Sequence, residues 1–235
     1  MLWLPLLCFA AVSGSSPTAW AAETLRGRLR ADRREDFSAY VVWIADGAKL
    51  PPVPPRPGPE EALMTQKDKA FSPRTLAIRA GGRVRFLNRD AIYHNVFSPD
   101  PRNPFDIGMY RKARRLKGSG PHRTLKPVVV FEQAGMQSVF CDLHPDMEGV
   151  VHVFDHGYYA MADKKGFFTL PWSGGSSVVL SVDGPRLPEP RSIFVNLAGA
   201  DGVVEVALEL ERYPVVAPHA RKDGTQYRSS FPGQR

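Results

Sequence analysis

Residues 140–147 read FCDLHPDM and bring three different metal-binding side chains into one short stretch. A thiol, an imidazole and a thioether fall three residues apart, at Cys141, His144 and Met147. These are the ligand types of a copper site made of two histidines and one cysteine, with a long axial methionine. Two other interpretations stay open from these residues alone. One is a buried cysteine in a turn, and the other is a Cys141–His144 nucleophile pair.

A copper site of this kind needs a second imidazole from elsewhere in the chain, and the candidate is His94. It follows two segments, 75–79 and 83–87, whose residues alternate in polarity. The Ala-Gly-Gly sequence at 80–82 indicates a turn between them. We therefore expect 75–87 to form a β-hairpin.

Further short strands are expected on both sides of Cys141. Residues 128–131, 137–140 and 150–154 are rich in β-branched and aromatic side chains, with glycines at the breaks. Cys141 then lies at the end of a strand, and 142–148 forms the loop to the next one. The ligands are expected on loops at one end of a β-sandwich, where a rigid scaffold can hold a metal geometry.

Together these segments resemble a cupredoxin, the small blue copper domain of the plastocyanin and amicyanin type, over residues 63–156. The matching pieces are FSP at 71–73, AGGRVRF at 80–86, NRD at 88–90, HNV at 94–96, Gly135 and the Cys-x-x-His-x-x-Met loop. The short ligand loop is more similar to that of amicyanin than to that of plastocyanin. A longer excursion than a minimal cupredoxin has, over 98–124, precedes the strand that leads to the cysteine.

The resemblance implies a Greek-key β-sandwich that holds one copper ion per chain. His94, Cys141 and His144 would be the equatorial ligands, and Met147 would be the axial ligand. Asn95 would connect the two ligand loops through hydrogen bonds and so support the ligands from behind.

The flanking segments predict a second β-sandwich, so the expected fold class is all-β. Residues 24–30 and 39–44 read as two strands, and more short strands follow the cupredoxin-like region. The sequence GFFTLP at 166–171 resembles the transthyretin-like, carboxypeptidase-regulatory sandwich. Because two strands are too few for a stable sheet, we expect 22–62 and 157–212 to form one discontinuous accessory domain.

The two ends of the chain have their own patterns. An apolar stretch over 2–12 and the small-x-small sequence AWA at 19–21 predict a signal peptide over 1–21. A membrane-tethered helix is disfavoured by Pro5 and by the short apolar length. We expect a periplasmic or otherwise exported protein that is soluble after cleavage and has no membrane span. Residues 213–235 show no periodicity and predict a disordered basic tail.

Composition and missing motifs exclude several functions. The formal net charge of +7 points to anionic partners. The sequence has no Walker or dinucleotide fingerprint, and it has no His-x-His pair for the further copper centres of a multicopper oxidase. We expect that the protein is not an enzyme. The basic segment 111–117 lacks interleaved aromatic residues and belongs to a chain expected to be exported, so nucleic acid is not an expected partner.

Three functions remain open. The first is a one-electron carrier, since a thiolate, a thioether and two imidazoles suit both copper oxidation states. The electron would leave through His144, between Leu143 and Pro145, toward a redox protein such as an acidic cytochrome or dehydrogenase. Arg114 and Arg115 would steer that partner. The second is a copper-binding and copper-handling protein, and the third is a structural module with a merely stabilising copper.

Overall fold

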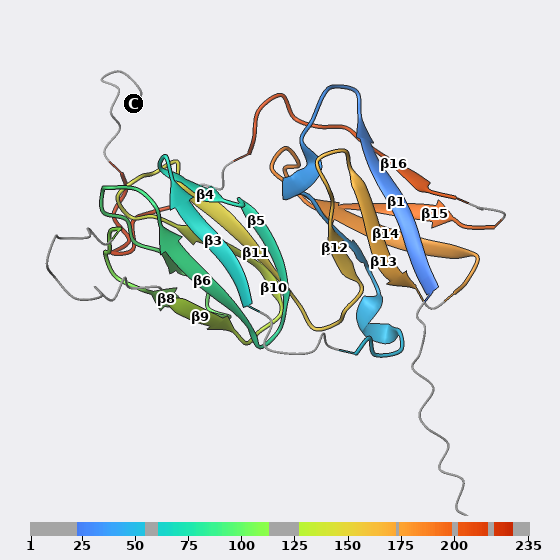
Figure 1. The fold of residues 1–235 in the computed structure, drawn as a ribbon, viewed down its shortest axis with the longest axis horizontal. Coiled ribbons are helices and arrows are strands. Elements are labelled where there is room, and N and C mark those ends of the chain that lie inside the picture. The colour runs from blue at the N-terminus through green and yellow to red at the C-terminus, as the bar shows by residue number, and fades with distance from the viewer. Residues whose placement is uncertain are drawn as a thin grey trace, which may run out of the picture.

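The computed structural model describes residues 23–54, 61–112, 127–172, 174–198, 202–215 and 219–227. The predicted signal peptide lies outside these residues. Over the described part, the chain forms four β-sheets and two short 3-10 helices, Phe37–Ala39 and Gly47–Lys49. The sheets make two β-sandwiches that lie side by side (Figure 1), so the predicted all-β fold is confirmed. Within the described ranges, no helix is long and apolar enough to cross a bilayer.

The first sandwich carries the predicted ligands. One of its sheets has the strand order β4-β3-β6-β9, and the other has the order β5-β11-β10-β7-β8. Side chains from both sheets form one hydrophobic core, which includes Met64, Phe86, Phe131 and Val139. Its strands are β3 (Glu61–Lys67), β4 (Ala70–Ser72), β5 (Thr75–Arg79), β6 (Gly82–Asn88), β7 (Phe97–Ser98), β8 (Phe105–Asp106), β9 (Val128–Phe131), β10 (Gly135–Phe140) and β11 (Glu148–Phe154).

The predicted hairpin over 75–87 is wrong. β5 pairs with β11 in one sheet, whereas β6 pairs with β3 and β9 in the other. The turn between them, with Gly81 at φ 81°, therefore crosses from one sheet to the other. Its amides still have partners, because Ala80 donates to the Phe154 carbonyl and Gly81 to the Phe131 carbonyl, both at 2.8 Å. Alternating polarity shows that a strand has one buried face, but it does not identify the neighbouring strand.

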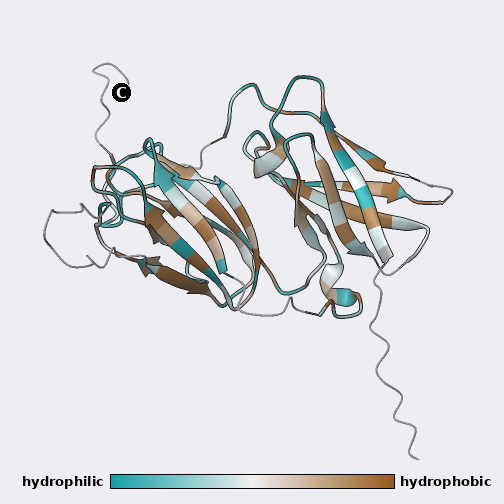
Figure 2. Ribbon diagram, viewed as in Figure 1, coloured by the Kyte–Doolittle hydropathy of each residue, from teal (hydrophilic) through white to brown (hydrophobic). Residues whose placement is uncertain are grey.

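The second sandwich combines the two N-terminal strands with strands from the C-terminal part. β1 (Glu23–Ala31) lies between β13 (Phe167–Trp172) and β16 (Val204–Leu208). β2 (Val41–Ile44) lies between β12 (Tyr159–Met161) and β14 (Ser177–Asp183), and β15 (Arg191–Asn196) follows at the edge. Figure 2 shows hydrophobic and hydrophilic residues alternating along β1, whose Leu25 and Leu29 enter the core. That these strands form one discontinuous accessory domain, and that this domain is similar to a transthyretin-like sandwich, stay predictions.

Polar contacts join the two sandwiches. On β11, His152 lies with its Nε2 2.9 Å from Oδ2 of Asp183 on β14. Arg74 pairs with Glu148, the first residue of β11, at 2.9 Å, and it also donates to the Val215 carbonyl at 2.7 Å. The strand that follows the ligand loop is therefore connected directly to the C-terminal part of the chain.

Residues 219–227 of the predicted disordered tail are among those that the structure describes. This segment contains no strand or helix, but it lies against the first sandwich, with the His219 ring stacked on Phe140 at 4.0 Å between centroids. The Tyr227 hydroxyl lies 3.2 Å from the carbonyl oxygen of Cys141. Missing periodicity excludes a regular strand or helix, but it carries no information about long-range contacts of this kind.

Replacing Gly27 on β1 by alanine is expected to destabilise the accessory sandwich. A Cβ at this position would lie 2.1 Å from Cζ of Phe168, whose buried ring covers the glycine from β13. Overpacking of this kind costs about 1–3 kcal/mol. Gly202→Ala is the control, because no atom lies within 4 Å of a Cβ there. Thermal unfolding followed by circular dichroism makes the comparison, and equal midpoints for the two variants would contradict the packing of β1 against β13.

Candidate metal centre

The loop 141–147 is closed by its own backbone. Cys141 follows the last residue of β10, and its amide donates to the carbonyl of Met147 at 3.2 Å. Within the loop, the amide of His144 donates to the Cys141 carbonyl at 3.3 Å, and the amide of Met147 donates to the His144 carbonyl at 3.0 Å. The spacing of three residues in the sequence thus corresponds to two successive turns, which bring Cys141 and His144 close together.

His94 reaches the same place from the other sheet. It lies beyond the end of β6 and forms an antiparallel bridge with Tyr110, with backbone hydrogen bonds of 3.0 and 2.8 Å. Asn88, the last residue of β6, donates from Nδ2 to the carbonyls of Ile92 and Tyr110, each at 3.0 Å. These bonds fix the backbone of the loop before His94. The side chain of His94 is fully buried.

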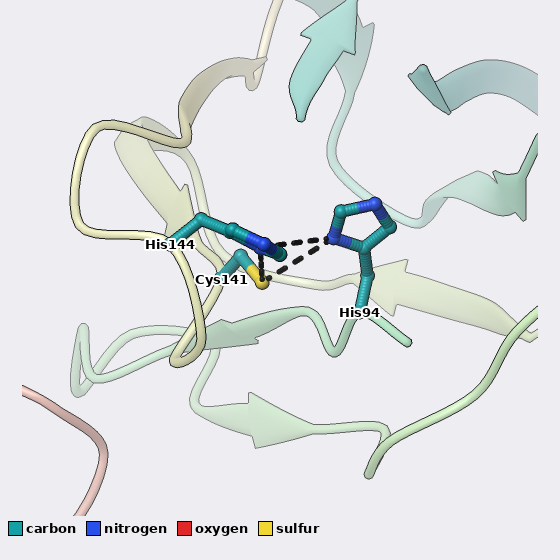
Figure 3. A group of neighbouring side chains, drawn as sticks. All are labelled: His94, Cys141 and His144. Carbon is teal, nitrogen blue, oxygen red and sulfur yellow. Dashed lines mark hydrogen bonds between the residues drawn. The ribbon is translucent and has the colours of Figure 1, made fainter. Parts of the chain in front are cut away.

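The side chains of His94, Cys141 and His144 converge on one point (Figure 3). The two imidazole Nδ1 atoms lie 3.2 Å apart, and the thiol sulfur lies 3.7 Å from Nδ1 of His94 and 3.5 Å from Nδ1 of His144. Nitrogen and sulfur donors bind transition metals at about 2.0–2.3 Å, so three donors in a plane around one ion lie roughly 3.5–3.7 Å apart. The three atoms are therefore already near the spacing that a shared ion requires.

Asp90 fixes the orientation of His94. Its Oδ2 lies 2.8 Å from Nε2 of the imidazole, which places the ring proton on Nε2 and leaves Nδ1 free to bind a metal. The carboxylate also accepts the amides of Asp68 and Lys69, at 2.8 and 3.1 Å. Burial raises the pKa of the Asp90 carboxyl group. The hydrogen bonds lower it, the bond with His94 most of all, and the pKa of Asp90 lies below its ordinary value. The result is a charged carboxylate that fixes a candidate metal-binding histidine.

The other two donors are neutral in the metal-free protein at pH 7. Burial raises the pKa of the Cys141 thiol, although backbone hydrogen bonds act in the opposite direction. Burial, and then the neighbouring His94, lower the pKa of His144. An ion that binds here must therefore displace the thiol proton, whereas His144 can bind at once through its lone pair.

Asn95 connects the two ligand loops. Its Oδ1 accepts the amide of Asp142, next to Cys141, at 2.7 Å. Its backbone carbonyl in turn accepts from Nε2 of Gln66 on β3, at 3.0 Å. The contact on which the predicted role of Asn95 depends is therefore present, and its effect on a bound metal stays a prediction.

The remaining predicted residues fall into two groups. Met147 is fully buried in the same hydrophobic cluster as Cys141, whereas Leu143 is 39% exposed and Pro145 is exposed beside the half-buried His144. Arg114 and Arg115 lie outside the described residues.

Sequence reasoning missed Asp90 and the C-terminal segment. Asp90 stands four residues before His94, and this spacing within a loop could have been noticed, because a carboxylate often supports a metal-binding histidine. No comparable signal exists for Tyr227, which lies 86 positions from Cys141 in the chain.

Comparisons with known proteins found similar chains among solved structures only. No protein-family model and no curated protein matches. Among solved structures, an oxidized methionine-to-leucine variant of amicyanin is 21% identical, covers 39% of this chain and 80% of its own, and has a TM-score of 0.33. A reduced proline-to-phenylalanine variant is 20% identical, covers 48% of this chain and 98% of its own, and has the same TM-score of 0.33. The structural similarity to amicyanin thus spans up to 48% of the chain.

The chemistry of the donor set fits copper. Two imidazole nitrogens and a thiol sulfur lie within 4.8 Å of one another. Among the residues that the structure describes, they form the group of histidine, cysteine and acidic side chains that could hold a metal ion. With Met147 buried beside Cys141, the cluster is consistent with a type 1 copper site.

Replacing Asp90 by asparagine is expected to weaken copper binding about 10- to 100-fold, because His94 loses the charged partner that fixes its tautomer. Competition with a chelator of known affinity measures the change.

Asp68→Asn makes the same chemical change in the adjacent turn, at an 84% exposed side chain, and should leave the affinity unaltered. Equal affinities for both variants would show that Asp90 does not support the site.

Proposed function

We propose that this protein is a type 1 copper protein that carries single electrons between redox partners. The observation that carries the proposal is the convergence of His94, Cys141 and His144, from loops of both sheets, within 4.8 Å. Copper, one ion per chain, would supply the reversible one-electron chemistry. Residues 63–156 would form a cupredoxin-type domain, with Met147 as the axial ligand.

The surrounding residues support this function by keeping the donors in place. Asp90 holds the His94 ring, Asn95 holds the amide that follows Cys141, and the loop is closed by its own hydrogen bonds. Donors that are fixed in advance move little when the charge of the ion changes, which favours fast electron transfer.

The four residues of the proposed site differ in their exposure to solvent. His94, Cys141 and Met147 are fully buried, so water has no direct access to these donors. His144 is partly exposed, between the exposed Leu143 and Pro145. An electron would therefore enter and leave through His144, with these two neighbours in contact with the partner.

The same burial argues against the alternative function of copper handling. A protein that passes copper on needs donors that an incoming ligand can reach, and neither the Cys141 sulfur nor the His94 ring is accessible. Electron transfer needs no such access, since the ion stays in place.

We propose that the partner is an acidic redox protein, such as a cytochrome or dehydrogenase. The segment 111–117 is strongly basic. Its first residue directly follows Tyr110, which pairs with His94. The Arg111 guanidinium lies 5.1 Å from the centre of the Tyr93 ring, next to His94. Positive charge therefore begins at the ligand-bearing end, where it would accelerate encounter with a negative partner.

We also propose that the protein works outside the cytoplasm, in the periplasm or an equivalent compartment. The support is the signal-peptide pattern over 1–21 and a thiol that is buried and has no second cysteine in the mature chain to pair with.

The proposal predicts an intense thiolate-to-copper charge-transfer band in the copper-loaded protein. Cys141→Ser should abolish this band, because a hydroxyl does not replace the soft, deprotonated sulfur. Visible and EPR spectra after addition of one equivalent of Cu(II) make the measurement.

His156→Gln is the matched control. This histidine lies beyond the end of β11, where its ring accepts the amide of Tyr158 at 3.1 Å, and its loss should leave the spectrum unchanged. An intense band that survives in the Cys141→Ser variant would overturn the assignment.

Reversal of Arg114 and Arg115 to glutamate should slow electron transfer to an acidic partner about tenfold at low salt, without altering the copper spectrum. Physiological salt should shrink the difference, because exposed charges are screened beyond about 8 Å. Stopped-flow kinetics at two ionic strengths measures both effects.

Lys164→Glu with Lys165→Glu is the control, since it changes the net charge equally in an exposed turn of the accessory sandwich. Rates that fall equally in both double variants would show that net charge acts, and not the placement of Arg114 and Arg115.

A further inference from the structure

The C-terminal segment 219–227 crosses the loop that carries Cys141. Its backbone forms a closed turn, in which the amide of Arg221 donates to the Thr225 carbonyl at 2.8 Å and the amide of Gly224 donates to the Arg221 carbonyl at 2.9 Å. Asp223 strengthens the turn by accepting the amide of Thr225 at 2.9 Å. The segment is therefore locally ordered, and its side chains have defined positions beside the ligand loop.

A backbone amide and a guanidinium group of this segment contact the side chain of Asp142, the residue after Cys141. The amide of Lys222 donates to Oδ1 of Asp142 at 3.0 Å, and Nη2 of Arg221 lies 3.5 Å from the other carboxylate oxygen. The Lys222 side chain reaches Asp106 on β8, with 2.7 Å between Nζ and Oδ2. Lys222 thus connects the ligand loop with the edge strand of the sheet.

Aromatic groups make a second contact, closer to the ligand itself. The Tyr227 hydroxyl donates to the carbonyl of Cys141 at 3.2 Å. The His219 ring lies between Tyr227, at 5.3 Å, and Phe140, at 4.0 Å between centroids.

We propose that residues 219–227 act as a clamp on the ligand loop, and that Tyr227 is a positioning residue for Cys141. This inference rests on the proposed copper site. From one side, Asn95 fixes the amide of Asp142, and from the other side Tyr227 fixes the carbonyl of Cys141. The peptide group between the cysteine ligand and its neighbour is therefore held at both of its polar atoms.

Tyr227 is the decisive contact of the clamp. The side chains of Arg221 and Lys222 are 40% and 42% exposed, and ion pairs at such positions contribute little. The tyrosine hydroxyl is part-buried, and a hydrogen bond of this kind changes an equilibrium constant about fivefold. Its donation to the Cys141 carbonyl also draws electron density from the ligand residue, which favours the reduced ion.

Tyr227→Phe in the full-length protein tests the clamp, because it removes the hydroxyl and keeps the ring beside His219. The loaded variant should release copper to a chelator about fivefold faster than the parent and should have a lower reduction potential. In the metal-free protein, hydrogen exchange at the amides of 142–144 and at Lys222 should be about fivefold faster. Tyr213→Phe is the control, since that ring is 68% exposed and lies outside the segment.

The outcomes separate the two proposals. Parent-like exchange in the metal-free Tyr227→Phe variant, together with parent-like copper release and potential, would overturn the clamp. Faster exchange with an unchanged potential and release rate would also overturn the positioning role, because the contact would then be only structural. If the parent protein forms no thiolate–copper band, the copper proposal fails, and the exchange comparison still decides whether the segment holds the loop.

Discussion

The constraint on which this structure depends is the close approach of a thiol and two imidazoles, with His94 and Cys141 fully buried and His144 half-buried. Polar groups in such a place are costly unless they have partners. His94 has Asp90 on its outer nitrogen at 2.8 Å, and the Cys141 backbone is tied at its amide and its carbonyl. Nδ1 of His94 is left to face the other two donors, because its Nε2 is occupied by Asp90. The geometry of the candidate metal site thus depends on the hydrogen bonds around it.

The packing of two sheets makes this convergence possible. His94 lies between β6 of one sheet and β7 of the other, and Phe97 on β7 pairs with Phe140, the residue before Cys141. Val96 and Cys141 both enter the hydrophobic core. The core is tight at this level, since a Cβ on Gly149 would lie 3.1 Å from Sδ of Met64. A close-packed core of this kind cannot relax far, and it transmits its rigidity to the loops at its end. Asn95 completes the connection between the two sheets at the level of the ligands.

The sequence predicts features formed by residues that are close in the chain, and it misses contacts between residues that are far apart in the chain. The loop from Cys141 to Met147 is local, and its spacing alone gave the strand end, the turn and the donor types. His94 needed one further motif, and the structure places it beside the other two donors at 3.2–3.7 Å. The hairpin over 75–87 failed because alternating polarity fits a crossing between sheets equally well. Tyr227 was not found because its contact with Cys141 depends on how two sandwiches pack, which no local pattern encodes.

The accessory sandwich explains how a segment so far along the chain comes to lie at the metal site. After β11 the chain leaves the first sandwich, builds β12 to β16, and returns at Val215. There the Val215 amide donates to the Pro185 carbonyl of the second sandwich at 2.7 Å, and its carbonyl accepts from Arg74 of the first at 2.7 Å. Arg74 also pairs with Glu148, the residue after Met147. The chain is thus anchored between the sandwiches shortly before it reaches the ligand loop, and the same arginine holds the far end of that loop. The second sandwich can in this way restrict the movement of the donors in the first.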